Sequence, residues 1–313
     1  MILGGTCYPP DVGKGLLIAF CACGAIVAAG VDLGMQVKEN LPSEVDPSIT
    51  PAPHSTPSET VAYSRPPGQV LKLDIYRPRP SNRTAAILLL HGGGWVGGSK
   101  ADMAELGNFI ASHGTLAASA DYRLAPANRW PTQLEDVQTA VRYLRANADK
   151  YNIDPHRVAA VGISAGGQLS LFLGAVNANK PLEYSGFSSR VEAVGSISGL
   201  HDLRLQMTSA GERYQIVEAL VGERQGPAVD AASPILHADH NTAPTYFVQG
   251  AIDPLVPPNQ TQEAARRLNQ LGVPEKSETV PGMGHGLSLR DKTQSEAFER
   301  MYAWILNQLD AKA

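Results

Sequence analysis

The chain has 313 residues, of which 43% are hydrophobic, so it can bury one large core without a second full domain. It carries 26 Lys and Arg against 30 Asp and Glu, a formal net charge of −4 at pH 7. This balance, together with the lack of a basic run, argues against nucleic acid as a partner. No self-similar repeat is evident in the sequence.

The first 31 residues differ in composition from the rest of the chain. After Asp11 and Lys14, the stretch Gly15–Val31 is uncharged and apolar, and small residues at positions 28–30 resemble a signal-peptidase site. We expect residues 1–31 to be a secretory signal peptide, with an uncleaved membrane anchor or a buried helix as alternatives. All 3 cysteines fall here, so an exported (periplasmic or secreted) mature protein would lack thiols and suit an oxidising compartment.

Residues 32–60 are expected to form a linker. Prolines recur among Ser, Thr and Glu at positions 42, 47, 51, 53 and 57. This spacing is incompatible with a helix or a central strand, because proline lacks the backbone N–H that both structures use. The remaining residues, 61–313, are expected to form a single folded domain.

Strand-like and helix-like segments alternate after the linker, which is typical of an α/β protein with a doubly wound, mostly parallel sheet and helices on both faces. Apolar and polar residues alternate over Leu71–Tyr76, which predicts an antiparallel edge strand with one face in water. The apolar run Ala85–Leu90 predicts a strand buried on both faces. Helices are expected at Met103–Ser112 and Thr132–Ala148.

A glycine-rich loop follows the strand predicted at Ala85–Leu90. Its sequence is His91-Gly-Gly-Gly-Trp95. Acyl transfer creates an oxyanion that two or three backbone N–H groups must approach, and glycine allows this approach because it has no Cβ. A phosphate cradle would instead need Gly-Lys-Ser/Thr or the dinucleotide-binding spacing, and neither is present. A merely flexible loop remains the alternative.

A serine between two glycines marks the turn from a predicted strand to a predicted helix. The apolar run Arg157–Val161 leads into Gly162-Ile-Ser164-Ala-Gly166, and a helix-like stretch covers Ala165–Leu173. This context is typical of a nucleophile elbow, where the sharp turn exposes the serine hydroxyl. The alternative is a chance match in a chain with 30 Gly. We expect Ser164 to be the nucleophile.

An aspartate follows the strand predicted at Pro244–Gln249. An acid at this exit, Asp253, can accept a hydrogen bond from an imidazole, fix its tautomer and stabilise the imidazolium. Asp202 is the rival, because it also follows a predicted strand, Val191–Ile197. Asp253 is preferred because one helix and one strand separate it from the candidate histidine, in the order serine, acid, histidine.

The candidate histidine, His285, lies in a glycine-rich loop after the short strand predicted at Ser277–Val280. Such a loop can place its imidazole over Ser164. We interpret the other histidines as surface residues: His54, His113, His156, His201, His237 and His240. His237 and His240 have no acid or cysteine cluster nearby, so no metal site is predicted.

An insertion of about 35 residues, at positions 199–233, lies between the strand after the elbow helix and the strand that bears Asp253. We expect a small lid there, too short for a full lipase cap. The hypothesis that follows is an open, shallow acyl pocket that favours short acyl esters or acylated sugars.

These motifs give the chain, from about Val61 to Leu309, a resemblance to α/β-hydrolases of the esterase and lipase branch with a His-Gly-Gly-Gly-Trp loop. Asp-Tyr-Arg-Leu-Ala-Pro at 121–126 and Ile-Asp-Pro-His-Arg-Val at 153–158 strengthen it. Residues 91–100 are similar to a subgroup of acetylxylan- and feruloyl-type carbohydrate esterases and kynurenine formamidases. One departure is Gln249, where that family often has His before the glycine.

The resemblance implies that the N–H groups of Gly93, Gly94 and Ala165 form the oxyanion hole. It also implies a serine carboxylesterase that acts on small-molecule esters through an acyl-enzyme, without metal or organic cofactor. An amide hydrolase of the kynurenine formamidase kind is the alternative. A non-catalytic binding protein on the same fold is a third reading, although no member of the expected catalytic set is missing.

Overall fold

The computed structural model describes residues 56–79, 83–178, 183–206 and 213–311. The expected signal peptide and most of the expected linker lie outside them. Strand β1 (Glu59–Ser64) begins two residues inside the expected linker, so the predicted domain start at 61 is slightly too late. The Thr60 hydroxyl donates to Asp74 over 2.6 Å, which fastens this first strand to the second. No helix of the described residues is long and apolar enough to span a bilayer.

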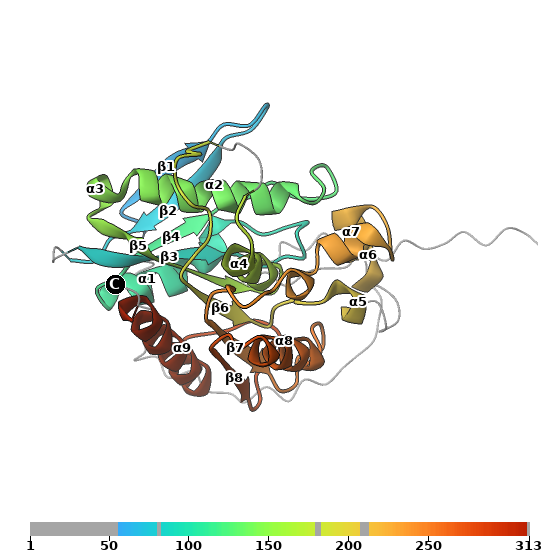
Figure 1. Ribbon diagram of the computed structural model, residues 1–313. Helices are drawn as coiled ribbons and strands as arrows, with labels where there is room; N and C mark the ends of the chain where they lie inside the picture. The colour runs from blue at the N-terminus through green and yellow to red at the C-terminus, as the bar shows by residue number, and fades with distance from the viewer. Residues whose placement is uncertain (1–55, 80–82, 179–182, 207–212, 312–313) are drawn as a thin grey trace, which may run out of the picture. The chain divides into compact units, whose positions relative to one another are not determined.

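The described residues form one sheet of eight strands in the order β1-β2-β4-β3-β5-β6-β7-β8 (Figure 1). The remaining strands are β2 (Leu71–Tyr76), β3 (Thr84–Leu90), β4 (Leu116–Ala120), β5 (Ile153–Ile163), β6 (Ala193–Ile197), β7 (Thr245–Gly250) and β8 (Glu275–Val280). Strand β2 is antiparallel to both β1 and β4, and every other pair is parallel. The predicted mostly parallel sheet is therefore confirmed.

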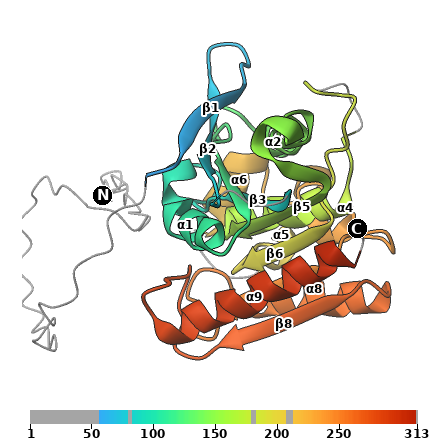
Figure 2. The ribbon, with the colours of Figure 1, turned by 90° about the vertical axis from the view of Figure 1, so that its left-hand side faces the viewer.

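Helices cover both faces of this sheet (Figures 1 and 2). They are α1 (Ala104–Ser112), α2 (Thr132–Ala146), α3 (Ala148–Tyr151), α4 (Ala165–Ala175), α5 (Leu203–Gln206), α6 (Arg213–Val221), α7 (Pro227–Ala231), α8 (Asn259–Gln270) and α9 (Lys292–Asp310). Short 3-10 turns occupy η1 (Lys100–Met103) and η2 (Pro234–Leu236). Helices α1 and α9 pack on one face, whereas α2, α4 and α8 pack on the other. The sheet is therefore doubly wound, as predicted.

Strand β3 shows why its sequence is apolar without a break. Its residues at 86, 88 and 90 pack into the core beneath α2 and α4, and those at 85, 87 and 89 pack beneath α1 and α9. Each side chain is at most 2% exposed. Burying a leucine or isoleucine stabilises the fold by about 1.5–3 kcal/mol, so both faces of the strand contribute.

Strand β2 differs from its prediction, because it is neither an edge strand nor wet on one face. Strand β1 covers its outer edge, and Asp74 and Tyr76 are buried while Lys72 is exposed. Tyr76 packs against α1 at Gly107, where a Cβ would lie 2.6 Å from the tyrosine ring. Asp74 is paired with Lys100 at 3.1 Å. Asp74 is thus satisfied by Lys100 and by the Thr60 hydroxyl instead of water, whereas Tyr76 is buried through the packing of its ring.

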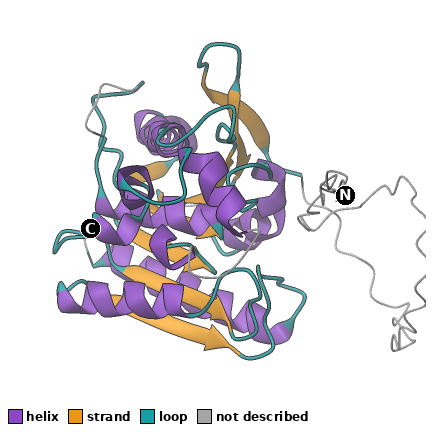
Figure 3. Cartoon of the chain, turned by 90° about the vertical axis from the view of Figure 1, so that its right-hand side faces the viewer, coloured by secondary structure: helices purple, strands orange, loops and turns teal. Residues whose placement is uncertain are grey.

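The loops that carry the predicted site follow β3, β5, β7 and β8. Because these strands are parallel, their carboxyl ends lie at one edge of the sheet. The insertion between β6 and β7 contains α5, α6 and α7, which gather at one end of the domain (Figures 1 and 3). The sheet topology therefore brings sequence-distant loops and the insertion together.

Candidate active site

Ser164 occupies a strained turn between β5 and α4. Its backbone has φ 57° and ψ −118°, in a region that non-glycine residues rarely adopt. The Ser164 amide donates to the Ile197 carbonyl at the end of β6 over 2.8 Å, and its own carbonyl accepts from Gln168 over 3.2 Å. Strain of this kind costs about 1–3 kcal/mol and persists only where neighbouring bonds enforce it. The turn has the geometry expected of a nucleophile elbow.

The glycines on either side of Ser164 are required by the packing of this turn. A Cβ at position 162 would lie 2.1 Å from the Gly166 carbonyl oxygen, and one at position 166 would lie 2.0 Å from the Leu90 carbonyl oxygen. Both distances are far shorter than van der Waals contact. The Gly-x-Ser-x-Gly spacing is therefore a consequence of how closely helix α4 approaches β3 and β5.

Asp253 and His285 contact each other directly. Nδ1 of His285 lies 2.9 Å from Oδ2 of Asp253. The other carboxylate oxygen, Oδ1, accepts hydrogen bonds of 2.9 Å from the amides of Leu255 and Val256. The Asp253 side chain is fully buried, whereas that of His285 is 20% exposed. Two residues 32 positions apart are thus joined at the carboxyl edge, and Nε2 is left as the ring nitrogen available to another group.

The hydrogen bonds around Asp253 keep its carboxylate ionised. Burial is the largest single influence and raises the pKa, because it disfavours the charged form. The hydrogen bonds from His285, Val256 and Leu255 together outweigh burial, so the pKa lies below its ordinary value of 3.8. Asp253 is therefore negatively charged at neutral pH and can hold an imidazolium.

The rival acid, Asp202, is engaged elsewhere. Its carboxylate pairs with Arg204, with distances of 2.9 Å to Nε and 2.6 Å to Nη2. It also accepts the Arg204 amide over 3.0 Å, which closes a tight turn at the start of the insertion. In the described part of the chain, the acid that contacts His285 is Asp253.

The glycine loop after β3 adopts a backbone that glycine makes accessible. Gly93 and Gly94 have φ values of +102° and +59°. A Cβ on Gly93 would lie 2.3 Å from the Gly97 carbonyl oxygen, and one on Gly92 would lie 3.3 Å from Cβ of Ser164. The loop thus lies directly against the elbow. Within the described ranges, no backbone carbonyl accepts a hydrogen bond from the amides of Gly93, Gly94 or Ala165.

Neighbouring segments hold this loop in place. The Tyr122 ring stacks on His91 at 4.1 Å between centroids, and its hydroxyl donates to the His91 carbonyl over 2.9 Å. The Ala125 amide donates to the Trp95 carbonyl over 2.8 Å. Trp95 is fully buried, and its Nε1 donates to Oε1 of Gln168 in α4 over 3.2 Å. The motif at 121–126 therefore acts as a brace for the glycine loop.

Sequence reasoning misplaced His201, which is fully buried instead of lying on the surface. Its ring contacts Ser196 Oγ at 2.9 Å and the Gln260 carbonyl at 3.3 Å. Burial lowers its pKa from 6.5 to about 4, so it is neutral in the fold at pH 7. The remaining histidines predicted to lie on the surface are exposed at 113, 156, 237 and 240, and His54 lies outside the described residues.

Helix α6 of the insertion lies over the glycine loop. A Cβ built on Gly94 would lie 3.3 Å from Cγ2 and 3.7 Å from Cδ1 of Ile216. Ile216 is half-buried against the core that surrounds α4. The insertion therefore places an apolar side chain beside the loop, at a position that the sequence did not single out.

Two buried glutamines at the site also escaped prediction. Gln168 links the glycine loop to the insertion, because its Nε2 donates to the Ala232 carbonyl over 2.8 Å. Gln249 contacts Asp253, with 3.2 Å between Nε2 and Oδ2. The available signal was an amide in an otherwise apolar helix or strand, since buried polar side chains need partners.

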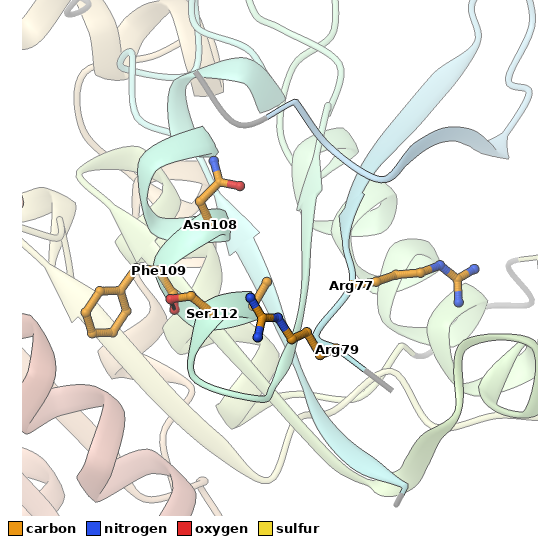
Figure 4. Close-up of a pocket in the computed structure, with 6 residues that line it drawn as sticks. Arg77, Arg79, Asn108, Phe109 and Ser112 are labelled. Atoms are coloured by element: carbon orange, nitrogen blue, oxygen red, sulfur yellow. Dashed lines mark hydrogen bonds between the residues drawn. The ribbon is translucent and has the colours of Figure 1, made fainter. Parts of the chain in front are cut away.

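A hollow of about 430 Å³ lies at the edge of the sheet opposite to the one that carries Ser164, Asp253 and His285 (Figure 4). It is lined by Arg77, Arg79, Asn108, Phe109, Ala111 and Ser112. The end of β2 borders it, and Tyr76 pairs with Ala117 at the start of β4, which places the hollow at the amino ends of the parallel strands. It is therefore separate from the serine, the acid and the histidine.

The fold defines an α/β-hydrolase. Residues 73–268 match the BD-FAE family, and the chain belongs to that family.

Known relatives and solved structures agree with this assignment. The chain is 32% identical to Esterase LipC of Mycobacterium tuberculosis over 80% of this chain and 64% of LipC. It spans about half to two thirds of the length of the first curated relatives that it matches. A truncated carbohydrate esterase from gut microbiota superposes with a TM-score of 0.72 at 28% identity, over 83% of this chain and 99% of the other. The esterase Est2 of Thermogutta terrifontis, solved with propionate bound, superposes with a TM-score of 0.69 at 25% identity, over 83% and 96%.

Proposed function

We propose that the protein is a serine carboxylesterase in which Ser164 is the nucleophile, His285 the general base and Asp253 the acid that orients it. The observation that supports this most strongly is the hydrogen bond between His285 Nδ1 and a buried, ionised Asp253, at the sheet edge that also carries the strained Ser164 turn. Nδ1 is engaged by Asp253, so the tautomer with an unprotonated Nε2 can accept a proton from serine.

The reaction follows from these roles. The Ser164 Oγ–H bond breaks as Oγ attacks the ester carbonyl carbon, and the proton passes to Nε2 of His285. The amides of Gly93, Gly94 and Ala165 stabilise the oxyanion, and each donor contributes about 3–4 kcal/mol. His285 then protonates the leaving alcohol as the C–O bond breaks, which leaves an acyl-enzyme. Water, deprotonated by His285, attacks the acyl carbon, and the acid product leaves as serine recovers its proton.

We infer a preference for short acyl groups. Ile216 lies beside Gly94, so it limits the room next to an acyl group whose carbonyl oxygen points at the Gly93 and Gly94 amides. The propionate in the Est2 structure supports a short acyl group, and the carbohydrate esterase supports a sugar as the alcohol. The proposed substrates are therefore short-chain esters, including acylated sugars.

An amide hydrolase of the formamidase kind would use the same residues with a nitrogen leaving group. The observation that favours the ester is the naming of the relatives, since LipC and both solved neighbours are described as esterases. A direct comparison of an ester with the matching anilide separates the two activities.

The test is hydrolysis of p-nitrophenyl acetate, butyrate and decanoate by the full chain, beside Ser164→Ala. We expect turnover of acetate and butyrate, weak turnover of decanoate, and a loss on the order of 10⁴-fold or more in the variant. A folded wild type that hydrolyses none of these esters would reject the proposal. A rate that rises steadily from acetate to decanoate would reject only the short-acyl preference.

We also propose that residues 1–31 direct export, with membrane anchoring as the alternative. The support is the apolar composition of Gly15–Val31 and the small residues that end it. Expression of the full chain in a bacterial host, followed by fractionation and intact-mass measurement, tests it. A periplasmic product shortened by about 30 residues is expected. A full-length product in the cytosol would contradict export.

A further inference from the structure

Gln249 connects the proposed acid to the body of the domain. It lies one residue before the end of β7, and its side chain is completely buried. Nε2 lies 3.2 Å from Oδ2 of Asp253 and 3.1 Å from the Val256 carbonyl oxygen. Oδ2 is also the oxygen that accepts the hydrogen bond from His285. One carboxylate oxygen is thus shared between the amide and the imidazole.

The orientation of this amide is fixed by its surroundings. The Thr261 hydroxyl, on α8, donates to Oε1 of Gln249 over 3.1 Å. The reversed orientation would place Oε1 against two acceptors, the Asp253 carboxylate and the Val256 carbonyl, which cannot donate to it. The Nε2 group therefore faces Asp253, and Thr261 locks it there.

We propose that Gln249 is a positioning residue for the Asp253–His285 pair, an inference that rests on the proposed esterase function. The amides of Leu255 and Val256 hold Oδ1, and Gln249 holds Oδ2, so the carboxylate plane is fixed at both oxygens. The His285 ring then points where Asp253 directs it. Gln249 thereby fixes the position of His285 relative to α8 and β7, acting through Asp253 and without contact to the substrate.

The Gln249 side-chain amide is uncharged, and this matters for catalysis. A cation at position 249 would pair with Asp253 and cancel part of the negative charge that stabilises the imidazolium. An amide donates a hydrogen bond without adding a charge. Gln249 therefore orders Asp253 while leaving its charge to His285.

Loss of this donor is expected to lower kcat more than it changes KM, because His285 acts in the transition state. A hydrogen bond to a charged group corresponds to roughly tenfold or more in an equilibrium or rate. Gln249→Met keeps the side-chain length but removes the donor. We expect kcat to fall on the order of tenfold, while KM for p-nitrophenyl butyrate changes by less than about twofold.

A matched control is Gln260→Met. Gln260 is equally buried, but its amide binds the backbone of His201 and Asp202 instead of the Asp253–His285 pair. Both substitutions remove a buried amide and lower stability. A difference in kcat between the two variants therefore reports the effect that acts through Asp253. Gln260→Met should leave kcat within about twofold of wild type at a temperature where both variants are folded.

The decisive experiment is a double-mutant cycle on the full chain. If Gln249 acts through Asp253, Gln249→Met lowers kcat of Asp253→Asn by less than about twofold. Full additivity of the two losses would overturn the proposal, and so would an unchanged kcat in Gln249→Met. If Gln249→Met fails to fold, Thr261→Val takes its place, because it removes the hydroxyl that holds the Gln249 amide in its orientation. We expect Thr261→Val to lower kcat by less than Gln249→Met would. We also expect it to cause no further loss of kcat in an Asp253→Asn background.

A proton NMR measurement separates this proposal from the esterase proposal. The downfield resonance of the His285 Nδ1 proton, assigned by its loss in His285→Gln, reports the bond to Asp253 without any turnover. It should shift or broaden in Gln249→Met and stay in place in Gln260→Met. An unmoved resonance in Gln249→Met would refute the positioning role, even if Ser164→Ala shows that the enzyme is a serine esterase. A shifted resonance would support positioning, even if the wild type hydrolyses no ester.

Discussion

At the scale of single residues, close backbone contacts decide the site. Helix α4 approaches β3 so closely that Gly166 has no room for a Cβ, and the strain at Ser164 persists because these contacts enforce it. The motif was readable from the sequence for the same reason, since few residues other than glycine tolerate such contacts. Gln249 was not readable as a partner of Asp253, because its hydrogen bonds depend on a turn that only the fold creates.

Substitution of Gly166 tests this contact. In Gly166→Ala, the new Cβ would lie 2.0 Å from the Leu90 carbonyl oxygen, so the helix must move. We expect the free energy of unfolding to fall by at least about 1–3 kcal/mol, measured by urea denaturation, and ester hydrolysis to be lost. Gly186→Ala is the control, because its Cβ would meet nothing within 4 Å. Equal stability of the two variants would contradict the steric account.

His201 predicts a pH dependence of stability. Its pKa in the fold, about 4, lies below the 6.5 of an exposed histidine. As pH falls from about 6.5 to about 4, the unfolded chain binds the proton and the folded chain does not. The free energy of unfolding therefore decreases over this window, by up to about 3 kcal/mol for this one group.

Urea denaturation at several pH values measures this effect. His201→Gln should flatten the decline in the free energy of unfolding between pH 6.5 and 4, compared with wild type. An equal slope in wild type and His201→Gln would show that His201 does not titrate as its burial implies.

At the scale of elements, the periodicity of apolar residues and the composition of each segment predicted the parallel strands well, because buried parallel strands are apolar on both faces. The prediction failed for β2, where Asp74 pairs with Lys100 and the Tyr76 ring packs against α1. Periodicity and composition also left open how the insertion meets the site. The contact between Ile216 and Gly94 joins segments more than a hundred residues apart, and no local pattern encodes it.

This contact predicts a change in substrate range. Ile216→Ala removes three methyl or methylene carbons beside the glycine loop, so longer acyl chains should gain access. We expect the ratio of kcat/KM for p-nitrophenyl octanoate to that for acetate to rise on the order of tenfold. Leu236→Ala, a truncation of an exposed apolar residue, is the control. An unchanged ratio in Ile216→Ala would show that another element sets the acyl limit.

At the scale of the whole molecule, the described residues from 56 onward contain the complete sheet, its helices and every proposed catalytic residue. The two core clusters that sandwich the sheet draw their members from β1 to α9. A chain that begins at Thr56 should therefore keep kcat/KM within about twofold of the full chain. Loss of folding or activity in this shortened chain would show that the preceding residues belong to the catalytic unit.

The central claim is that Ser164 forms the covalent intermediate, and chemical labelling tests it most directly. The full chain would be treated with phenylmethanesulfonyl fluoride, which reacts with activated serine hydroxyls, and the modified peptide would be identified by mass spectrometry. We predict one adduct, on Ser164, with a parallel loss of butyrate ester hydrolysis. Ser164→Ala should form no adduct, and His285→Gln should form it more slowly than the wild type. Labelling of a different serine, or full activity after Ser164 is modified, would contradict the account.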